Sequence, residues 1–151
     1  MEVQENIINK IKLRKIKRSD YDQIVQLQLI CFPGMKPWNE TQFNNLLTIF
    51  PEGQLCILTN DEIIASSCSL IINFDSYSET SSWGELTDHG NITNHSIKGD
   101  TLYGMEIMVN PLYRGMKLSR RLYDSRKNIA KHYNLKRILI GGRLPNYINH
   151  C

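Results

Sequence analysis

The stretch Leu102–Ile140 constrains the fold most, because it predicts a strand, a helix and a second strand in direct succession. Leu102–Val109 and Leu135–Ile140 are mostly apolar, and Lys117–Tyr133 carries apolar residues at helical spacing among basic ones. Two strands joined by one helix pair in parallel through a right-handed crossover. The turn around Arg114 therefore lies where a strand ends and a helix begins, the place at which α/β sheets commonly bind anions.

The rest of the chain supplies the other elements of an α/β fold, recognised by alternating or helical spacing of apolar residues. The sequence predicts an edge strand at Ile11–Ile16, a helix from Asp20 to Phe32, a helix from Asn39 to Phe50, and strands at Gln54–Thr59 and Ile63–Phe74. The predicted order is β-α-α-β-β-β-α-β. The polar segment Asp75–Asp100 is expected to be a long functional or mobile loop.

Short local signals mark the ends of these elements. Asp20 and its neighbours supply the cap of the first helix, and Asn39 followed three residues later by Gln42 predicts a capping box for the second. The Asn60-Asp61 pair between two strands predicts a tight hairpin turn.

Composition predicts a single globular domain over residues 1–151, with 41% hydrophobic and 22% charged residues. No apolar run approaches the roughly 20 residues that span a bilayer, and the first residues do not resemble a signal peptide. The four cysteines lack C-x-x-C spacing and the four histidines lack metal-ligand spacing. We therefore expect a cytoplasmic protein with reduced thiols, no metal and no membrane partner.

Basic residues gather in two clusters, one at Lys10–Arg18 and one on the helix Lys117–Tyr133. Such clusters are either solvated faces or contacts for an anion. A nucleic-acid partner is disfavoured, because aromatic residues do not interleave with the basic ones. The residues around Arg114 by themselves fit either a phosphate-binding loop or an ordinary connection in which Gly115 serves only the backbone.

The segment "IMVNPLYRGMKLSRRL" resembles the signature of the GNAT superfamily of N-acetyltransferases, a strand ending V-x-P-x-x-R-G before a glycine-rich helix start. The motifs "CFPGMKPW", "FPEGQ", "GDTLYGMEIMV" and "LKRILIGGRLPNY" look more narrowly like bacterial bifunctional proteins. In those, an amino-terminal GNAT domain precedes a carbon-nitrogen hydrolase domain. The resemblance runs from about Ile11 to Tyr147.

This resemblance implies a mixed central sheet flanked by helices and a site for acetyl-CoA, the co-substrate. The strand backbone would bond the pantetheine arm, and successive amides of the turn would hold the pyrophosphate. The residues implied for the coenzyme are Ile107, Met108, Val109, Arg114, Gly115, Met116, Lys117, Leu118 and Ser119. Arg120 or Arg121 could reach a coenzyme phosphate or be solvated charge.

The implied reaction transfers acetyl directly to the primary amine of a small molecule or a peptide. Glu106, expected to share a strand face with Met108 and Leu102, is the candidate general base, or else a carboxylate that is paired with a basic residue or faces solvent. A backbone N–H near Met108 or Val109 is the candidate oxyanion donor. Trp38 and Trp83 would either border the acceptor site or pack beneath a loop, and Tyr147 is a weak candidate general acid.

Two departures from the family pattern stand out. Lys117 occupies a position where the pattern has glycine, and Ser119 one where it has glycine or alanine. The usual carboxyl-terminal helix and strands are lacking, which predicts a truncated domain or a homodimer that completes the sheet. The alternative function is therefore a non-catalytic acyl-CoA-binding module that regulates a larger hydrolase-containing protein.

Overall fold

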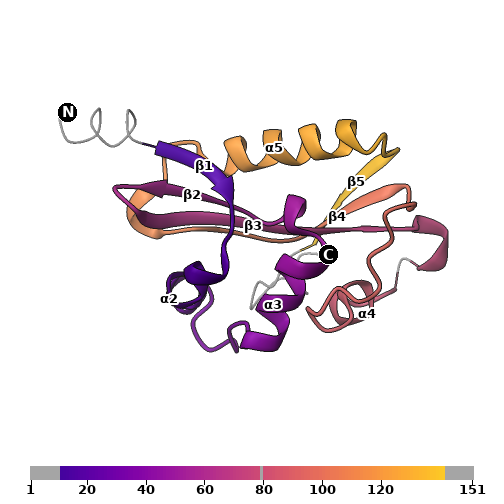
Figure 1. The fold of residues 1–151 in the computed structure, drawn as a ribbon, viewed down its shortest axis with the longest axis horizontal. Helices are drawn as coiled ribbons and strands as arrows, with labels where there is room; N and C mark the ends of the chain where they lie inside the picture. Colours follow the sequence, from indigo (N-terminus) through magenta and orange to yellow (C-terminus); the bar gives the residue numbers. More distant parts are fainter. Residues whose placement is uncertain (1–10, 79, 142–151) are drawn as a thin grey trace.

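The computed structural model describes residues 11–78 and 80–141 (Figure 1). Within these residues the chain forms one five-stranded sheet with helices on both faces. The strands are β1 (Ile11–Lys15), β2 (Leu55–Thr59), β3 (Glu62–Ile72), β4 (Thr101–Val109) and β5 (Arg137–Ile140). The helices are α2 (Tyr21–Cys31), α3 (Glu40–Ile49), α4 (Trp83–Thr87) and α5 (Leu118–His132).

The sheet order is β1-β2-β3-β4-β5, so each strand pairs with its neighbours in the chain. The first four strands are antiparallel, and β4 pairs with β5 in parallel through the crossover helix α5. The predicted fold class and order of strands are confirmed. Asn60 and Asp61 both have positive φ (52° and 66°), as the predicted two-residue hairpin turn requires.

The sheet separates two helical layers. Helix α5 covers one face over β3 and β4, whereas α2, α3 and α4 lie on the other face (Figure 1). Leu118 and Leu122 of α5 pack on Ile57, Ile64 and Ala65. The larger cluster holds the bulky aromatic residues Phe32, Trp38, Phe43 and Phe50, and the end of α5 also packs against it through Ile129 and Tyr133. Burial of these apolar side chains is the main force that holds both layers on the sheet.

The two predicted helix caps turned out differently. The Asn39 side chain accepts the Gln42 amide N–H (2.8 Å), and the Gln42 side chain accepts that of Asn39 (3.0 Å), which confirms the capping box. Asp20 does not cap α2 through its side chain. Its carboxylate instead pairs with the Arg14 guanidinium (2.7 Å) and accepts the Lys17 N–H, so it ties the end of β1 to the start of α2.

The polar segment between β3 and β4, expected as a long loop, contains secondary structure among its described residues. It contains the short helix α4 and the fully buried Ile92. Ser96 donates its N–H to Ile71 O (2.8 Å), so the segment is hydrogen-bonded to the end of β3. Five helical residues are too few for a 3.6-residue period to be visible in the sequence, which is why the pattern missed α4.

Strict alternation along β3 would put Ile64 on the same face as Cys68, four residues further on, but the structure does not. The pairing of β2 with β3 shifts register between Ile57 and Leu58, and Ile64 packs with the residues under α5. Cys68 belongs to the opposite cluster. One extra residue in a strand reverses the faces of the residues beyond it.

His95 is a neutral hydrogen-bond acceptor inside this fold. Its Nδ1 accepts the Ile71 N–H (2.9 Å), and its ring stacks on Phe50 with centroids 4.4 Å apart. Burial lowers the pKa of His95, and the nearby Glu52 carboxylate opposes the shift only in part.

We expect His95 to make stability depend on pH. The unfolded chain binds a proton at His95 near its usual pKa of about 6.5, whereas the folded chain binds it only at lower pH. The free energy of unfolding contributed by His95 is therefore present above about pH 6.5 and is lost as the pH falls below it. Urea unfolding from about pH 8 to about pH 5 measures this slope.

His95→Asn keeps an acceptor for the Ile71 N–H but removes the titration, so its slope should be shallower than that of the unmodified chain. His89→Asn, at an exposed position of the same segment, is the matched control and should keep the slope. Equal slopes for all three proteins would contradict the assignment.

Candidate functional site

The parallel strands β4 and β5 pair over only part of their length. Their register runs from Thr101 with Arg137 to Gly104 with Ile140, and Gly141 donates its N–H to Gly104 O (2.8 Å). Beyond Gly104, β4 continues to Val109 and pairs with β3 alone among the described residues. Among the described residues this part of β4 thus has an open edge, to which an extended ligand with amide groups could bond as an added strand.

The alternation of the ladder decides which backbone groups lie on this open edge. Asn110 donates its N–H to Ile64 O of β3 (2.8 Å), so residues Met108 and Asn110 direct their N–H groups toward β3. Ile107 and Val109, one residue out of phase, direct theirs to the open edge. Of the two expected oxyanion donors, Val109 is thus the one on the open edge.

The turn after β4 connects the open edge of β4 to the start of α5. A short 3-10 turn at Pro111–Tyr113 precedes Gly115 (φ 92°), and α5 begins at Leu118. Lys117 is the N-cap residue and makes no side-chain cap bond within the described part of the chain. The first N–H groups of α5, including those of Leu118 and Ser119, and the positive end of the helix dipole therefore favour an anion there.

Basic side chains surround this helix start. Arg114, Lys117, Arg120 and Arg121 are all exposed, so none is committed to the core. Met116 is half-buried against the apolar cluster under α5. The predicted coenzyme residues therefore form one continuous path, from the open edge of β4 to a basic helix N-terminus.

Lys117 adopts the left-handed conformation (φ 60°, ψ 30°). This conformation costs an L-residue about 1–2 kcal/mol but costs glycine little, which gives a physical reason for the family's glycine here. The exposed side chain leaves the backbone approachable and adds a positive charge beside the helix start.

Replacement of Lys117 by glycine should raise the free energy of unfolding by about 1 kcal/mol, since it relieves this conformation. Urea unfolding measures the change. Lys117→Met is the matched control, because it removes the charge but keeps a side chain at positive φ, and it should not stabilise the protein. A glycine variant less stable than the methionine variant would contradict the explanation.

Glu106 lies in the core on the opposite side of the sheet from α5. Its side chain is 1% exposed and its Oε1 accepts a hydrogen bond from Gln28 Nε2 (3.3 Å). Gln28 Oε1 in turn accepts the Trp38 N–H (2.8 Å), so a chain of bonds links β4, α2 and the start of α3. Gln28 is thus one hydrogen-bond partner of the Glu106 carboxylate.

A bulge in β4 alters the face on which Glu106 was expected. Cys68 of β3 pairs with Glu106 and Ser69 pairs with Gly104, so Met105 is an extra residue. A Cβ on Gly104 would overlap Arg126 of α5, whereas Glu106 contacts Gln28 of α2. The extra residue interrupts the alternation between Leu102 and Glu106, whereas the register between Glu106 and Met108 is regular.

The two tryptophans pack together at the end of this layer. Trp38 is 1% exposed and stacks on Trp83 with ring centroids 5.9 Å apart. Trp83 Nε1 donates to Met105 O (3.1 Å), which ties α4 to β4. Of the two expected roles, packing is the one these contacts support for Trp38. Tyr147 lies outside the described residues.

Neither Gln28 nor Arg126 was given a site role from the sequence. Gln28 is 3% exposed between apolar neighbours on α2, and a polar residue on a buried stripe was the signal. Arg126 follows Leu122 by four residues, so it also lies on the buried stripe of its helix. Cys31 Sγ donates to Val109 O (3.4 Å), which places a half-buried thiol beside the open edge. Burial raises the pKa of this thiol, while Val109 and Arg114 oppose the shift.

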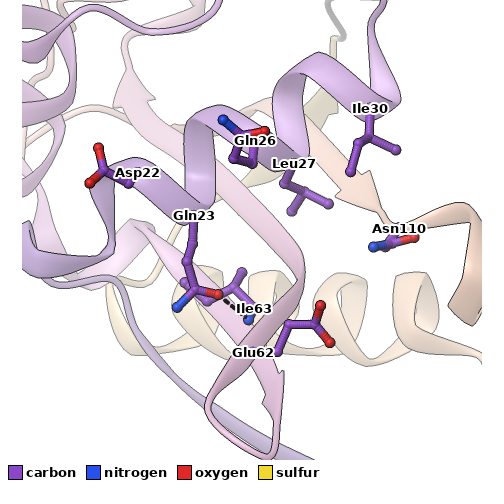
Figure 2. Close-up of a pocket in the computed structure, with 8 residues that line it drawn as sticks. All are labelled: Asp22, Gln23, Gln26, Leu27, Ile30, Glu62, Ile63 and Asn110. Carbon is purple, nitrogen blue, oxygen red and sulfur yellow. Dashed lines mark hydrogen bonds between the residues drawn. The ribbon is translucent and has the colours of Figure 1, made fainter.

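A furrow of about 200 Å³ lies between α2 and the start of β3, with Asn110, the residue after β4, also in its lining (Figure 2). Leu27, Ile30 and Ile63 are its apolar residues, and Asp22 and Glu62 are its acidic ones. Two carboxylates would repel coenzyme phosphates. The furrow is therefore unsuited to the coenzyme, unlike the basic turn before α5.

The described residues contain no group of three His, Cys, Asp or Glu side chains placed to hold a metal ion. None of the helices in this part of the chain is long and apolar enough to cross a membrane.

The mixed sheet, with its parallel pair parting beside a basic helix start, is that of an α/β acyltransferase domain. The chain belongs to the acetyltransferase (GNAT) family, whose sequence profile matches residues 21–150. This confirms the resemblance drawn from the motifs.

Two relatives come from Bacillus subtilis (strain 168). The chain is 50% identical to the probable hydrolase YhcX over 138 residues, 91% of this chain and 27% of YhcX. It is 35% identical to the N-acetyltransferase YkwB over 145 residues, 93% of this chain and 64% of YkwB. The chain therefore spans less than two thirds of the length of either relative.

Among solved structures, the loading GNATL domain of CurA from Lyngbya majuscula superimposes with a TM-score of 0.76. The match covers 92% of this chain and 68% of the other, at 16% identity, and it shows a shared fold. The match to a hydrolase over a small part of its length agrees with the expected resemblance to GNAT domains attached to hydrolases.

Proposed function

We propose that this domain transfers acetyl from acetyl-CoA to a primary amine, with Ile107–Val109 and Arg114–Ser119 as the coenzyme site. The observation that carries the proposal is the continuity of the open β4 edge with the basic, uncapped start of α5. The edge would bond the amides of pantetheine, and the helix start would hold the pyrophosphate. The open edge and the helix start follow one another in the protein as the pantetheine arm and the pyrophosphate do in the coenzyme.

The site also supplies groups for the chemistry. The amine attacks the thioester carbon, the Val109 N–H is the proposed donor to the developing oxyanion, and the C–S bond then breaks to release the coenzyme thiolate. Glu106 is the proposed acceptor of the proton that the attacking amine must lose. Gln28 holds the Glu106 carboxylate on the α2 side, from which the amine of a small molecule or a peptide would approach.

Two observations favour a second candidate, an acyl-CoA-binding module without catalysis. The chain matches 27% of a probable hydrolase, and the Glu106 side chain is 1% exposed. In a module, the same open edge and helix start would bind the coenzyme, and occupancy would regulate an attached hydrolase domain.

Acetyl-CoA should raise the melting temperature, because a ligand bound only by the folded state stabilises it. At 100 times the dissociation constant the expected stabilisation is about 2.7 kcal/mol, or roughly 5–11 °C for a domain of this size. Differential scanning fluorimetry measures the shift. A folded protein that shows no shift at millimolar acetyl-CoA would exclude both candidates.

Thiol release over a panel of amines then separates the enzyme from the module. If release occurs, Glu106→Gln should lower kcat by about 10²–10⁴-fold, the usual contribution of a general base, with acetyl-CoA binding retained. Unchanged turnover would remove Glu106 from the base role. Binding without release for any amine would favour the module.

Bound acetyl-CoA should also protect Cys31 from alkylation, because a pantetheine arm along Ile107–Val109 would cover the edge that the thiol contacts. Peptide mapping after iodoacetamide treatment reports each cysteine separately. Cys56 and Cys68 are buried and serve as internal controls that should not react in the folded protein. Cys31 labelling at the same rate with and without the coenzyme would contradict the proposed path.

A further inference from the structure

Arg126 of α5 is buried beneath the helix with its guanidinium against the sheet. The side chain is 1% exposed. Its Nε donates to Ser67 Oγ (2.9 Å), and its Nη2 donates to Cys68 O (3.1 Å) and to Glu106 O (2.9 Å). Burial lowers the pKa of Arg126, against opposing effects of Cys68, Tyr123 and Glu106. A buried cation bonded mainly to neutral oxygens is costly, so its position calls for a structural reason.

That position is the β4 bulge. Cys68 and Glu106, the pair on one side of the extra residue Met105, are the two residues whose carbonyls Arg126 binds. On the other side of the extra residue, Gly104 leaves room for the guanidinium, because a Cβ there would overlap Nη1. One planar group thus occupies the site where the ladder is disrupted.

The bulge determines which way Glu106 faces. In a regular strand Gly104 and Glu106 would share a face, and the Glu106 side chain would lie under α5. With the extra residue, Glu106 faces α2 and accepts the bond from Gln28. Loss of Arg126 would leave buried carbonyls without this donor and would favour the regular register, which turns Glu106 away from α2.

We infer that Arg126 is a positioning residue that holds the Met105 bulge and thereby directs the Glu106 carboxylate to the α2 side of β4. Its catalytic consequence rests on the proposed function, in which Glu106 accepts the proton of the amine. The structural consequence of the Arg126 contacts, which is the contact between Glu106 and Gln28, does not depend on the proposed function.

The catalytic test is a double-mutant cycle on kcat. Arg126→Lys keeps a charge but loses the planar fork, and we expect it to lower kcat by about 10–100-fold while KM for acetyl-CoA changes little. In a Glu106→Gln background the same change should lower kcat by no more than about twofold, because Arg126 acts through Glu106. Equal losses in both backgrounds, or no loss in the first, would overturn the inference.

Two further variants distinguish the expected loss of kcat from a general loss of folding. Gly104→Ala perturbs the guanidinium from the strand side and should reproduce the effect of Arg126→Lys. Lys127→Met, at the next position of α5 and exposed, should leave kcat unchanged. If the lysine variant does not fold, the alanine variant takes its place in the cycle, with the same outcomes.

NMR monitors the contact between Gln28 and Glu106 independently of activity. Glu106→Gln identifies the shift of the Gln28 side-chain amide that reports the Glu106 carboxylate. Arg126→Lys and Gly104→Ala should move this resonance, and Lys127→Met should not. An unmoved resonance in the folded variants overturns the inference. A moved resonance in a protein that transfers no acetyl would support it while the proposed function fails.

Discussion

The parting of β4 from β5 is the constraint on which the rest of the site depends. Parallel pairing stops at Gly104 and Ile140, yet β4 continues for five residues alongside β3. The open edge that results is held in place by β3 on its other side. The chain passes from β4 to the parallel strand β5 through the crossover helix α5, so α5 must begin near the end of β4. The open edge and the helix N-terminus are adjacent as a consequence of the topology.

The same stretch of β4 carries buried polar groups on both faces of the sheet. Arg126 approaches from α5 and binds the backbone, whereas Gln28 approaches from α2 and binds the Glu106 side chain. Polar groups buried without partners cost several kcal/mol, so a core built for stability alone would place apolar side chains here. Their presence at the bulge, beside the open edge, fits the catalytic site that we propose.

Residues whose structure depends on near neighbours were predictable from the sequence. The strand at Leu102–Val109 and the helix at Lys117–Tyr133 were each predicted to within one residue at either end. The capping box and the hairpin turn were predicted for the same reason, because each depends on a few consecutive residues. The coenzyme path could be proposed because its parts follow one another along the chain.

Features that depend on cross-strand partners were not predictable. Neither bulge has a local signal, so the faces of Ile64 and Glu106 relative to their neighbours became known only from the register. Arg126 was counted with the basic cluster of its helix, since its burial depends on the missing Cβ of a glycine on another element. The Gln28 contact joins residues 78 positions apart.

The chain of bonds from Trp38 through Gln28 to Glu106 bears on the two candidate functions. Gln28 is held at both ends of its amide, by the Trp38 N–H and by the Glu106 carboxylate. A proton acceptor must contact the amine or a water next to it, so turnover requires access to a side chain that is 1% exposed. In the proposed enzyme, that access would need displacement of Gln28 or of the segment between α2 and α3, which Trp38 anchors. Catalysis through Glu106 would therefore require movement on this side of β4, whereas coenzyme binding at the open edge of β4 would not.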